Sequence, residues 1–412
     1  MKIGIRIKSK ILSRRIPFTS FLCYFIMIPF LHPRGFDEYF DWYKELFTLW
    51  LYAAILLVGV LCAFDLCRKN FAIKKSMVAI LVYYAAMLGG TLMIQKGVGE
   101  GLQKMIAAPF LCIACSYYFQ RNCKGFLNCI CNLLLIDLGL TVVVFNPLFF
   151  GSLFRDELHL MFIGHVQIGA QLGILGIMLA YVLYQIYGWE LRSALLLLFS
   201  AGTMVLSLTS ASFMALAIIA AGGVYMKLSK KQKLLKQPPQ VYLIGYLAAN
   251  FGMFKMLELN NWLMPFSFLS LNGRNFIWRE AFRLAAKKPL FGYGVHGALI
   301  KVFWSYWVGD GKGMNYAHNQ IMQSLLDGGI VLLLLFLLMV FLHIRPARWA
   351  LPAFSRFGYV CLAAVFVVMT VEAPLEYYYY LIFFSMLAYI PEICKLLPMQ
   401  SYLKGIVLKQ CQ

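Results

Sequence analysis

Basic side chains gather in one polar stretch of an otherwise very hydrophobic chain, between Leu257 and Ala317-His318-Asn319. Histidine is available as neutral imidazole near neutral pH, and arginine stays charged and binds phosphate oxygens through a two-point fork. Charged groups are rare and usually functional in a chain of this kind. We therefore expect this stretch to act on an anionic substrate, and an enzyme is a stronger expectation than a transporter. The basic residues are Arg274, Arg279, Arg283, Lys287, Lys288 and His318.

The polar stretch contains one predicted amphipathic helix, from about Arg274 to Lys287, with Asn272 as its cap. Pro289 and the Gly292-Tyr293-Gly294 turn end it. Within these boundaries the helix has one apolar face that can pack on the rest of the protein. That face consists of Ile277, Ala281, Leu284 and Ala285.

The same helix carries Arg279, Arg283 and Lys287 at intervals of four residues. Like charges at this spacing destabilise a helix by about 0.2–0.5 kcal/mol per pair. Glu280 lies three residues before Arg283 and offsets part of that repulsion. The stripe therefore indicates an anionic partner, either a substrate phosphate or lipid headgroups.

The composition is that of a membrane protein with many spans. Apolar residues make up 62% and charged residues 13%, against about 45–50% and about 25% in soluble domains. The mean hydropathy is +0.75. A helix needs roughly 17–25 apolar residues to cross a bilayer, which predicts an all-α, polytopic, single integral membrane domain over 1–412. About twelve spans lie near 16–33, 46–66, 76–95, 105–120, 126–149, 165–187, 193–210, 211–227, 241–256, 320–343, 357–372 and 377–395.

The distribution of basic residues predicts the orientation. Most of the 37 Lys and Arg residues fall on one side of the predicted spans, and such residues favour the cytoplasmic side. We therefore expect both termini in the cytoplasm and the loop 257–318 outside it, late in the chain. The net charge of +20 is then explained by orientation and anionic lipid, so nucleic-acid binding is not expected.

Cysteine usage indicates neither a disulfide framework nor a metal site. The chain has 11 cysteines, an odd number, and none falls in the predicted outer loop. In apolar helices cysteine usually behaves as a small hydrophobic residue. We expect no metal and no cofactor.

Several motifs in the polar stretch, taken in order, resemble the family of O-antigen ligases and Wzy-type polymerases of O-antigen, capsule and exopolysaccharide. They are Gly273-Arg274, Trp278, the Pro-Leu-Phe-Gly-Tyr-Gly turn at 289–294, Ala317-His318-Asn319 and Gly329. The close match covers roughly 272–332. Elsewhere the chain is similar in its number of spans and in its large late outer loop. The resemblance implies an almost wholly transmembrane-helical fold, similar to that of GT-C glycosyltransferases.

The resemblance also implies an activity and site residues. A metal-independent glycosyltransferase would use an undecaprenyl-diphosphate-linked oligosaccharide as donor, in the bacterial cytoplasmic membrane. His318 would then be the general base, and Arg274 would bind the diphosphate. Many members have an arginine after a serine at the outer end of a middle span, whereas Ser207–Ser212 contains none. Arg155 in the preceding outer loop is the candidate that compensates.

Further candidates for substrate binding are Arg279, Arg283, Asn319, His165 and Glu372. His165 stands at the outer mouth of a predicted span, in a polar cluster similar to one in capsule-type polymerases. Glu372 lies in an outer turn, where it could orient His318 or an acceptor sugar. Each has a structural alternative, such as an interfacial or ion-paired side chain; for Arg155 this is an ion pair with the neighbouring Asp156 or Glu157.

We favour a polysaccharide polymerase, in which a lipid-linked repeat unit is also the acceptor. A ligase that moves the glycan to lipid A core or protein remains open, because the donor chemistry is the same. A lipid-linked oligosaccharide flippase is a third possibility from another class. The expected partners are the lipid-linked donor and acceptor and the bilayer, and the polymerase interpretation leaves room for a chain-length regulator.

Overall fold

The computed structural model describes residues 18–94, 101–146, 160–229, 233–259, 274–301, 313–349 and 352–397. This part of the chain is almost wholly helical. Its one sheet is a short antiparallel pair, β1 (Leu160–Met161) and β2 (Gly164–His165), in which Leu160 pairs with His165. The predicted all-α class is therefore confirmed.

Helices follow the predicted apolar segments closely. The α-helices are α1 (Phe18–Leu31), α2 (Asp41–Cys67), α3 (Lys75–Ile94), α4 (Gly101–Arg121), α5 (Cys123–Gly139), α6 (Gln167–Tyr187), α7 (Leu191–Leu206), α8 (Ser210–Leu228), α9 (Pro239–Leu259), α10 (Arg274–Lys287), α11 (Gln320–Ile344), α12 (Pro352–Val371), α13 (Tyr380–Ala388) and α14 (Ile390–Cys394). Short helical turns are η1 (Arg34–Glu38), η2 (Leu140–Val144), η3 (Lys233–Lys236), η6 (Arg345–Trp349) and η7 (Pro374–Glu376).

Among the described helices, 7 are long and apolar enough to cross a membrane. Shorter apolar helices cover 21–31, 191–206 and 356–371. The predicted span 241–256 coincides with α9, which contains Asn250, Lys255 and Glu258. The last predicted span, 377–395, is divided into α13 and α14 at Tyr389, just before Pro391. The protein is thus a helical membrane protein, and the count of about twelve spans stays a prediction.

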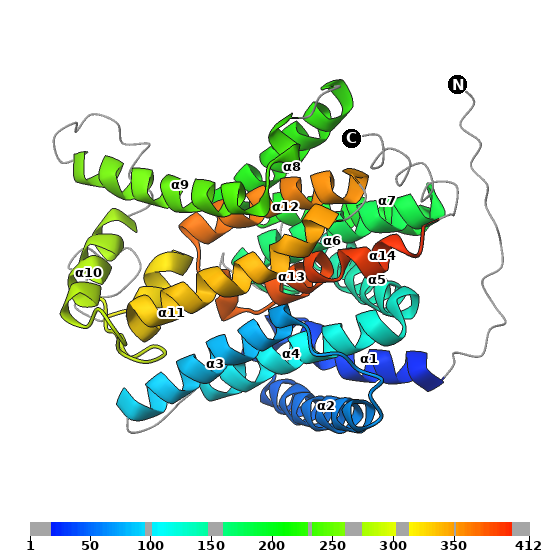
Figure 1. Ribbon diagram of the computed structural model, residues 1–412, viewed down its shortest axis with the longest axis horizontal. Helices are drawn as coiled ribbons and strands as arrows, with labels where there is room; N and C mark the ends of the chain where they lie inside the picture. Colours follow the sequence, from blue (N-terminus) through cyan, green and yellow to red (C-terminus); the bar gives the residue numbers. More distant parts are fainter. Residues whose placement is uncertain are drawn as a thin grey trace.

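Polar contacts mark the two ends of the helical bundle. At one end of α3, Lys74 Nζ lies 2.6 Å from Glu392 Oε1 of α14. At the other end, the Val295 backbone N–H donates to Thr91 Oγ1 over 3.0 Å. The second end is the one that α10 covers, beside α9 and the beginning of α11 (Figure 1). The described part of the predicted polar segment therefore caps one end of the bundle, while its limits at 257 and 318 and its side of the membrane stay predictions.

The helix predicted from Arg274 to Lys287 is confirmed as α10. Its apolar face is buried, with Ile277 4% and Ala281 0% exposed, and Trp278 is 1% exposed. These side chains form a small core of their own, separate from the main core of the bundle. The other buried members are Ala285, Ala298, Ile300, Ala317, Met322 and Leu326.

Helix α11 is broken near its beginning by two glycines. Gly328 and Gly329 have non-helical backbone angles, and φ at Gly329 is 65°. The Pro289–Gly294 turn fits into this break: the Ile330 N–H donates to the Pro289 carbonyl over 2.8 Å. A Cβ at position 329 would lie 2.3 Å from the Leu290 carbonyl carbon, so only glycine fits there. The two glycine-containing motifs of the sequence are therefore one structural unit.

Candidate active site

Glu372 brings together the two side chains that the sequence singled out first. Its Oε1 lies 2.6 Å from Arg274 NH2, and its Oε2 lies 3.1 Å from His318 Nδ1. The Glu372 side chain is 4% exposed, whereas those of Arg274 and His318 are 19% and 16% exposed. A buried carboxylate is stabilised only when it is paired and hydrogen-bonded. Glu372 therefore forms the floor of the site, and the arginine and histidine keep access to the outside.

Each of these three residues stands at the end of a helix. Arg274 is the first residue of α10, and Glu372 directly follows the last residue of α12. His318 lies two residues before α11. Helix ends can present side chains without distorting the helix, which is a rigid support. The site thus lies where the ends of α10, α11 and α12 meet.

Tyr316 completes this cluster, and sequence analysis did not identify it. Its hydroxyl donates to Glu372 Oε2 over 3.4 Å and accepts the Ala373 N–H over 2.8 Å. Its ring meets the His318 ring edge to face, with centroids 4.5 Å apart. The only feature of the sequence that could have identified Tyr316 is its position two residues before His318. Tyr316 fixes both the imidazole and the turn after Glu372.

His318 is held in an unusual backbone conformation. Its φ is 48°, in the left-handed region that non-glycine residues seldom adopt, although histidine is enriched there. Such strain costs on the order of 1–3 kcal/mol and clusters at functional sites. Two hydrogen bonds fix the residue before it: Trp278 Nε1 donates to the Ala317 carbonyl over 2.8 Å, and the Ala317 N–H donates to Gln323 Oε1 over 2.8 Å.

Asn319, predicted to bind substrate, has its side chain fully engaged within the protein. Its Oδ1 accepts the Met322 N–H and caps α11, while its Nδ2 donates to Asn250 Oδ1 and to the Thr370 carbonyl. The residue is 0% exposed. It joins α11 to α9 and α12, so the geometry favours a role in positioning His318 over direct contact with substrate.

The contact between Glu372 and His318 Nδ1 gives the two ring nitrogens of His318 different roles. The hydrogen-bond network indicates that Nδ1 carries the proton, because its neighbour is a carboxylate that can only accept. In that tautomer Nε2 is unprotonated and carries a basic lone pair. The imidazole can then accept a proton at Nε2, while Glu372 stabilises the resulting positive charge.

The other predicted arginines of α10 lie on its exposed face. The Arg283 side chain is 55% exposed and pairs with Glu280, with Nε donating to Oε2 over 2.7 Å. That hydrogen bond lowers the pKa of Glu280 below its usual value. The predicted offset by Glu280 is therefore confirmed. Arg279 is also exposed. A substrate would have to extend over α10 to reach either arginine.

His165 ends β2, and its Nδ1 accepts the Gln167 N–H over 3.4 Å at the beginning of α6. The serine and threonine side chains of the α7–α8 turn bond mainly to one another, with Ser207 Oγ donating to Ser212 Oγ over 2.7 Å. Arg155 lies outside the described residues. Its predicted compensation for the missing arginine stays a prediction.

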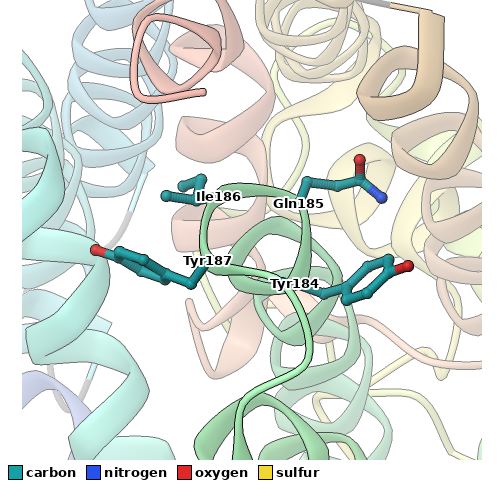
Figure 2. A pocket seen from close by; sticks show the side chains of 5 residues that line it. Tyr184, Gln185, Ile186 and Tyr187 are labelled. Atoms are coloured by element: carbon teal, nitrogen blue, oxygen red, sulfur yellow. The ribbon is translucent and has the colours of Figure 1, made fainter. Parts of the chain in front are cut away.

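Two cavities are lined by none of the residues that cluster around Glu372. One, of about 640 Å³, is lined by aromatic residues including Tyr181, Trp189 and Phe357. The other, of about 380 Å³, surrounds the end of α6, where Tyr184 and Tyr187 point in opposite directions (Figure 2). His165 precedes the other end of this 21-residue helix, roughly 30 Å away at 1.5 Å per residue. Neither cavity belongs to the candidate site.

Within the described ranges, no three His, Cys, Asp or Glu side chains converge in a way that could hold a metal ion. The cluster around Glu372 instead combines one carboxylate, one guanidinium, one imidazole and one phenol. This set can bind an anion and accept a proton from a hydroxyl group.

Residues 194–337 match the family model described as O-antigen ligase. No curated protein matches the chain significantly. The matched segment contains the motifs at 272–332 that carried the resemblance, and it includes Arg274 and His318 but neither Glu372 nor the first six helices. The family match confirms the predicted resemblance: residues 194–337 of this multi-pass helical membrane protein are similar to the family of O-antigen ligases and Wzy-type polymerases.

Proposed function

We propose that this protein is a polysaccharide polymerase that moves a glycan from undecaprenyl diphosphate onto a lipid-linked repeat unit. The observation that carries the proposal is that one buried carboxylate, that of Glu372, is bonded both to Arg274 and to His318. It links a candidate base to a candidate phosphate-binding group in one rigid cluster. The family match supports a ligase or polymerase type of membrane glycosyltransferase.

His318 is the general base. The acceptor hydroxyl oxygen attacks the anomeric carbon of the donor sugar, and its proton passes to His318 Nε2. Glu372, 3.1 Å from Nδ1, stabilises the imidazolium as it forms. The left-handed backbone at His318 keeps the imidazole over Glu372 before substrate binds, which reduces the reorganisation needed for reaction.

Arg274 holds the leaving group. As the bond between the anomeric carbon and the phosphate oxygen breaks, the electron pair goes to the departing undecaprenyl diphosphate. Arg274 donates through NH2 to Glu372, and within the described part of the chain its buried Nε has no hydrogen-bond partner. The remaining guanidinium donors can stabilise the charge on phosphate in a site shielded from water.

The ligase alternative uses the same donor and the same three side chains, and it differs only in the acceptor. A flippase would need its charged groups in a central cavity between comparable halves. Here the cluster lies under α10 at one end of the bundle (Figure 1). This placement favours transfer over transport.

The test is transfer by purified protein, with a synthetic lipid-diphosphate repeat unit and EDTA. Wild-type protein should give a ladder of products, and His318→Ala should lose at least about 10²-fold in rate, the lower range for a general base. His296→Ala is the matched control, because His296 is another left-handed histidine in the same polar segment. Products that form only after a separate acceptor is added would establish the ligase. Undiminished transfer by His318→Ala would remove His318 from the mechanism.

A further inference from the structure

Arg34, in the turn between α1 and α2, lies at the same end of the bundle, and sequence analysis did not single it out. Its NH2 donates to the Tyr378 hydroxyl over 2.6 Å. Its guanidinium carbon lies 5.1 Å from the centre of the Tyr378 ring and 6.0 Å from that of Tyr379. Residues 344 positions apart are thus joined. Arg34 also contacts the β1–β2 hairpin, because its N–H donates to the Ile163 carbonyl over 3.4 Å.

This arginine has no carboxylate partner in the described ranges. The nearest acidic neighbour in sequence, Asp37, is paired through Oδ2 with His32 Nε2 at 3.3 Å instead. The Arg34 Nε is buried and makes no hydrogen bond to any described residue. Burial acts to lower the pKa of Arg34, but Tyr378, Tyr379 and Asp37 outweigh it, so the pKa is raised and the side chain stays charged.

A half-buried guanidinium without a direct counter-ion destabilises the fold, because no ion pair offsets the free energy lost when the charge is desolvated. Arg121 pairs with Asp65 and Arg274 with Glu372, and the guanidinium of half-buried Arg192 donates to the amide oxygens of Asn128 and Asn132. Among the described residues, Arg34 instead has a tyrosine hydroxyl as its side-chain partner. An anionic ligand would supply the missing charge. Arginine next to tyrosine hydroxyls is suited to phosphate, which accepts several hydrogen bonds at once.

Arg34 and the candidate active site lie at the two ends of one turn. Glu372 begins this turn and Tyr378 ends it, with η7 between them. The turn is held firmly: the Leu375 N–H donates to Gln320 Oε1 over 3.2 Å, and Tyr378 is 3% exposed with a left-handed φ of 50°. The two guanidinium groups of Arg274 and Arg34 therefore have a fixed relation to each other.

We propose that Arg34 binds the diphosphate of the second lipid-linked saccharide, the acceptor, while Arg274 binds that of the donor. This inference rests on the proposed polymerase function, which requires two lipid diphosphates at once. Each carries negative charge, so holding both near one turn needs two separate cations. The rigid turn from Glu372 to Tyr378 would set the distance between donor and acceptor.

The experiment counts undecaprenyl diphosphate molecules bound to the purified full chain by native mass spectrometry in detergent. Wild-type protein should bind two. Arg34→Ala and Arg274→Ala should each bind one, and the double variant none. Arg68→Ala is the matched control: Arg68 also stacks on an aromatic ring, 3.9 Å from the Phe64 centroid, at the end of α2 where Asp65 pairs with Arg121. It should bind two.

Two further variants separate phosphate binding from a structural role. Tyr378→Phe removes the hydrogen bond but keeps the charge, so it should still bind two molecules. Arg34→Lys keeps the charge but loses the fork, so the second molecule should bind about tenfold more weakly, as expected for one lost hydrogen bond to a charged group. If Tyr378→Phe behaves like Arg34→Ala, or if Arg34→Ala loses both molecules, Arg34 only braces the turn and the inference is wrong.

Failure of this inference can be told apart from failure of the proposed function. A wild-type protein that binds one molecule, lost in Arg274→Ala and kept in Arg34→Ala, would overturn the acceptor site. It would leave the donor site in place and favour the ligase. A wild-type protein that binds none would count against the proposed function itself.

Discussion

Glu372 is the residue on which both proposed catalytic roles depend. Arg274 and His318 each contact a different oxygen of its carboxylate, so neither contact competes with the other. Tyr316 adds a third contact and fixes the turn that follows. The carboxylate does not touch the substrate in this scheme, and we regard Glu372 as a positioning residue that also stabilises charge on the imidazole.

Replacing Glu372 by glutamine should therefore lower kcat far more than it raises KM for the donor. The amide keeps the shape and part of the hydrogen bonding but cannot stabilise an imidazolium, so we expect a loss of about 10²-fold in kcat. Arg274, released from its ion pair, should still bind the diphosphate. Steady-state transfer kinetics measure the two constants separately.

Glu392→Gln is the control for this change, because Glu392 forms a similar ion pair with Lys74 at the other end of the bundle. Its kcat should equal that of wild-type protein. An unchanged kcat in Glu372→Gln, or an equal loss in both variants, would show that Glu372 has no special role in transfer.

Among the elements, the broken helix α11 is the one that positions the site. Its first part carries the His318 loop, and the break at Gly328–Gly329 receives the turn that follows α10. The Tyr293 N–H donates to the Leu326 carbonyl over 2.7 Å across this junction. These hydrogen bonds join α10 to α11 and so fix the position of Arg274 relative to His318.

Gly329→Ala should weaken this junction. A Cβ there would lie 2.3 Å from the backbone of Leu290 in a left-handed conformation, so we expect a loss of about 1–3 kcal/mol in stability from the backbone strain alone. The clash should also shift α10 and reduce transfer. Thermal unfolding in detergent and the transfer assay measure the two effects.

A helix glycine with open space around it provides the comparison. Gly89, within α3, has no atom within 4 Å of an added Cβ. Gly89→Ala should be neutral or stabilising by up to about 1 kcal/mol, because alanine favours helix. Equal unfolding midpoints for the two variants would mean that the turn at Pro289–Gly294 does not depend on the break in α11.

Considered as a whole, the described part of the molecule has a polar cluster at each end of the bundle. The candidate site and α10 lie at one end, and the contact between Lys74 and Glu392 marks the other (Figure 1). The distribution of basic residues predicts that the α10 end faces away from the cytoplasm. Lipid-linked glycans would then be joined outside the cytoplasm.

Labelling of cells with a membrane-impermeant maleimide tests this orientation. A cysteine at exposed Lys287 should react in intact cells if α10 lies outside, as the basic residues predict. Native Cys67, exposed at the end of α2 where Asp65 pairs with Arg121, should react only after the cells are opened. It serves as the internal control. The reverse pattern would place the site in the cytoplasm and contradict the proposed acceptor.

Sequence alone determined the class of protein, the helix from Arg274 to Lys287 and the family resemblance around His318. Each depends on local information: the length of an apolar run, the spacing of polar residues on one helix, or a short motif. Glycine signals at 292 and 329 were visible too, but their shared role was not. It required knowing that a turn fits into a break in another helix.

Only the tertiary structure decided which residues meet. Glu372 is 98 positions from Arg274 and 54 from His318, and Arg34 is 344 from Tyr378. In a bundle of apolar helices, many arrangements bury similar hydrophobic surface, so composition does not distinguish among them. What distinguishes them is the pairing of the few buried polar groups, because an unpaired one is costly away from water. Those pairings form between helix ends that are distant in sequence, and they become visible only when the helices are packed.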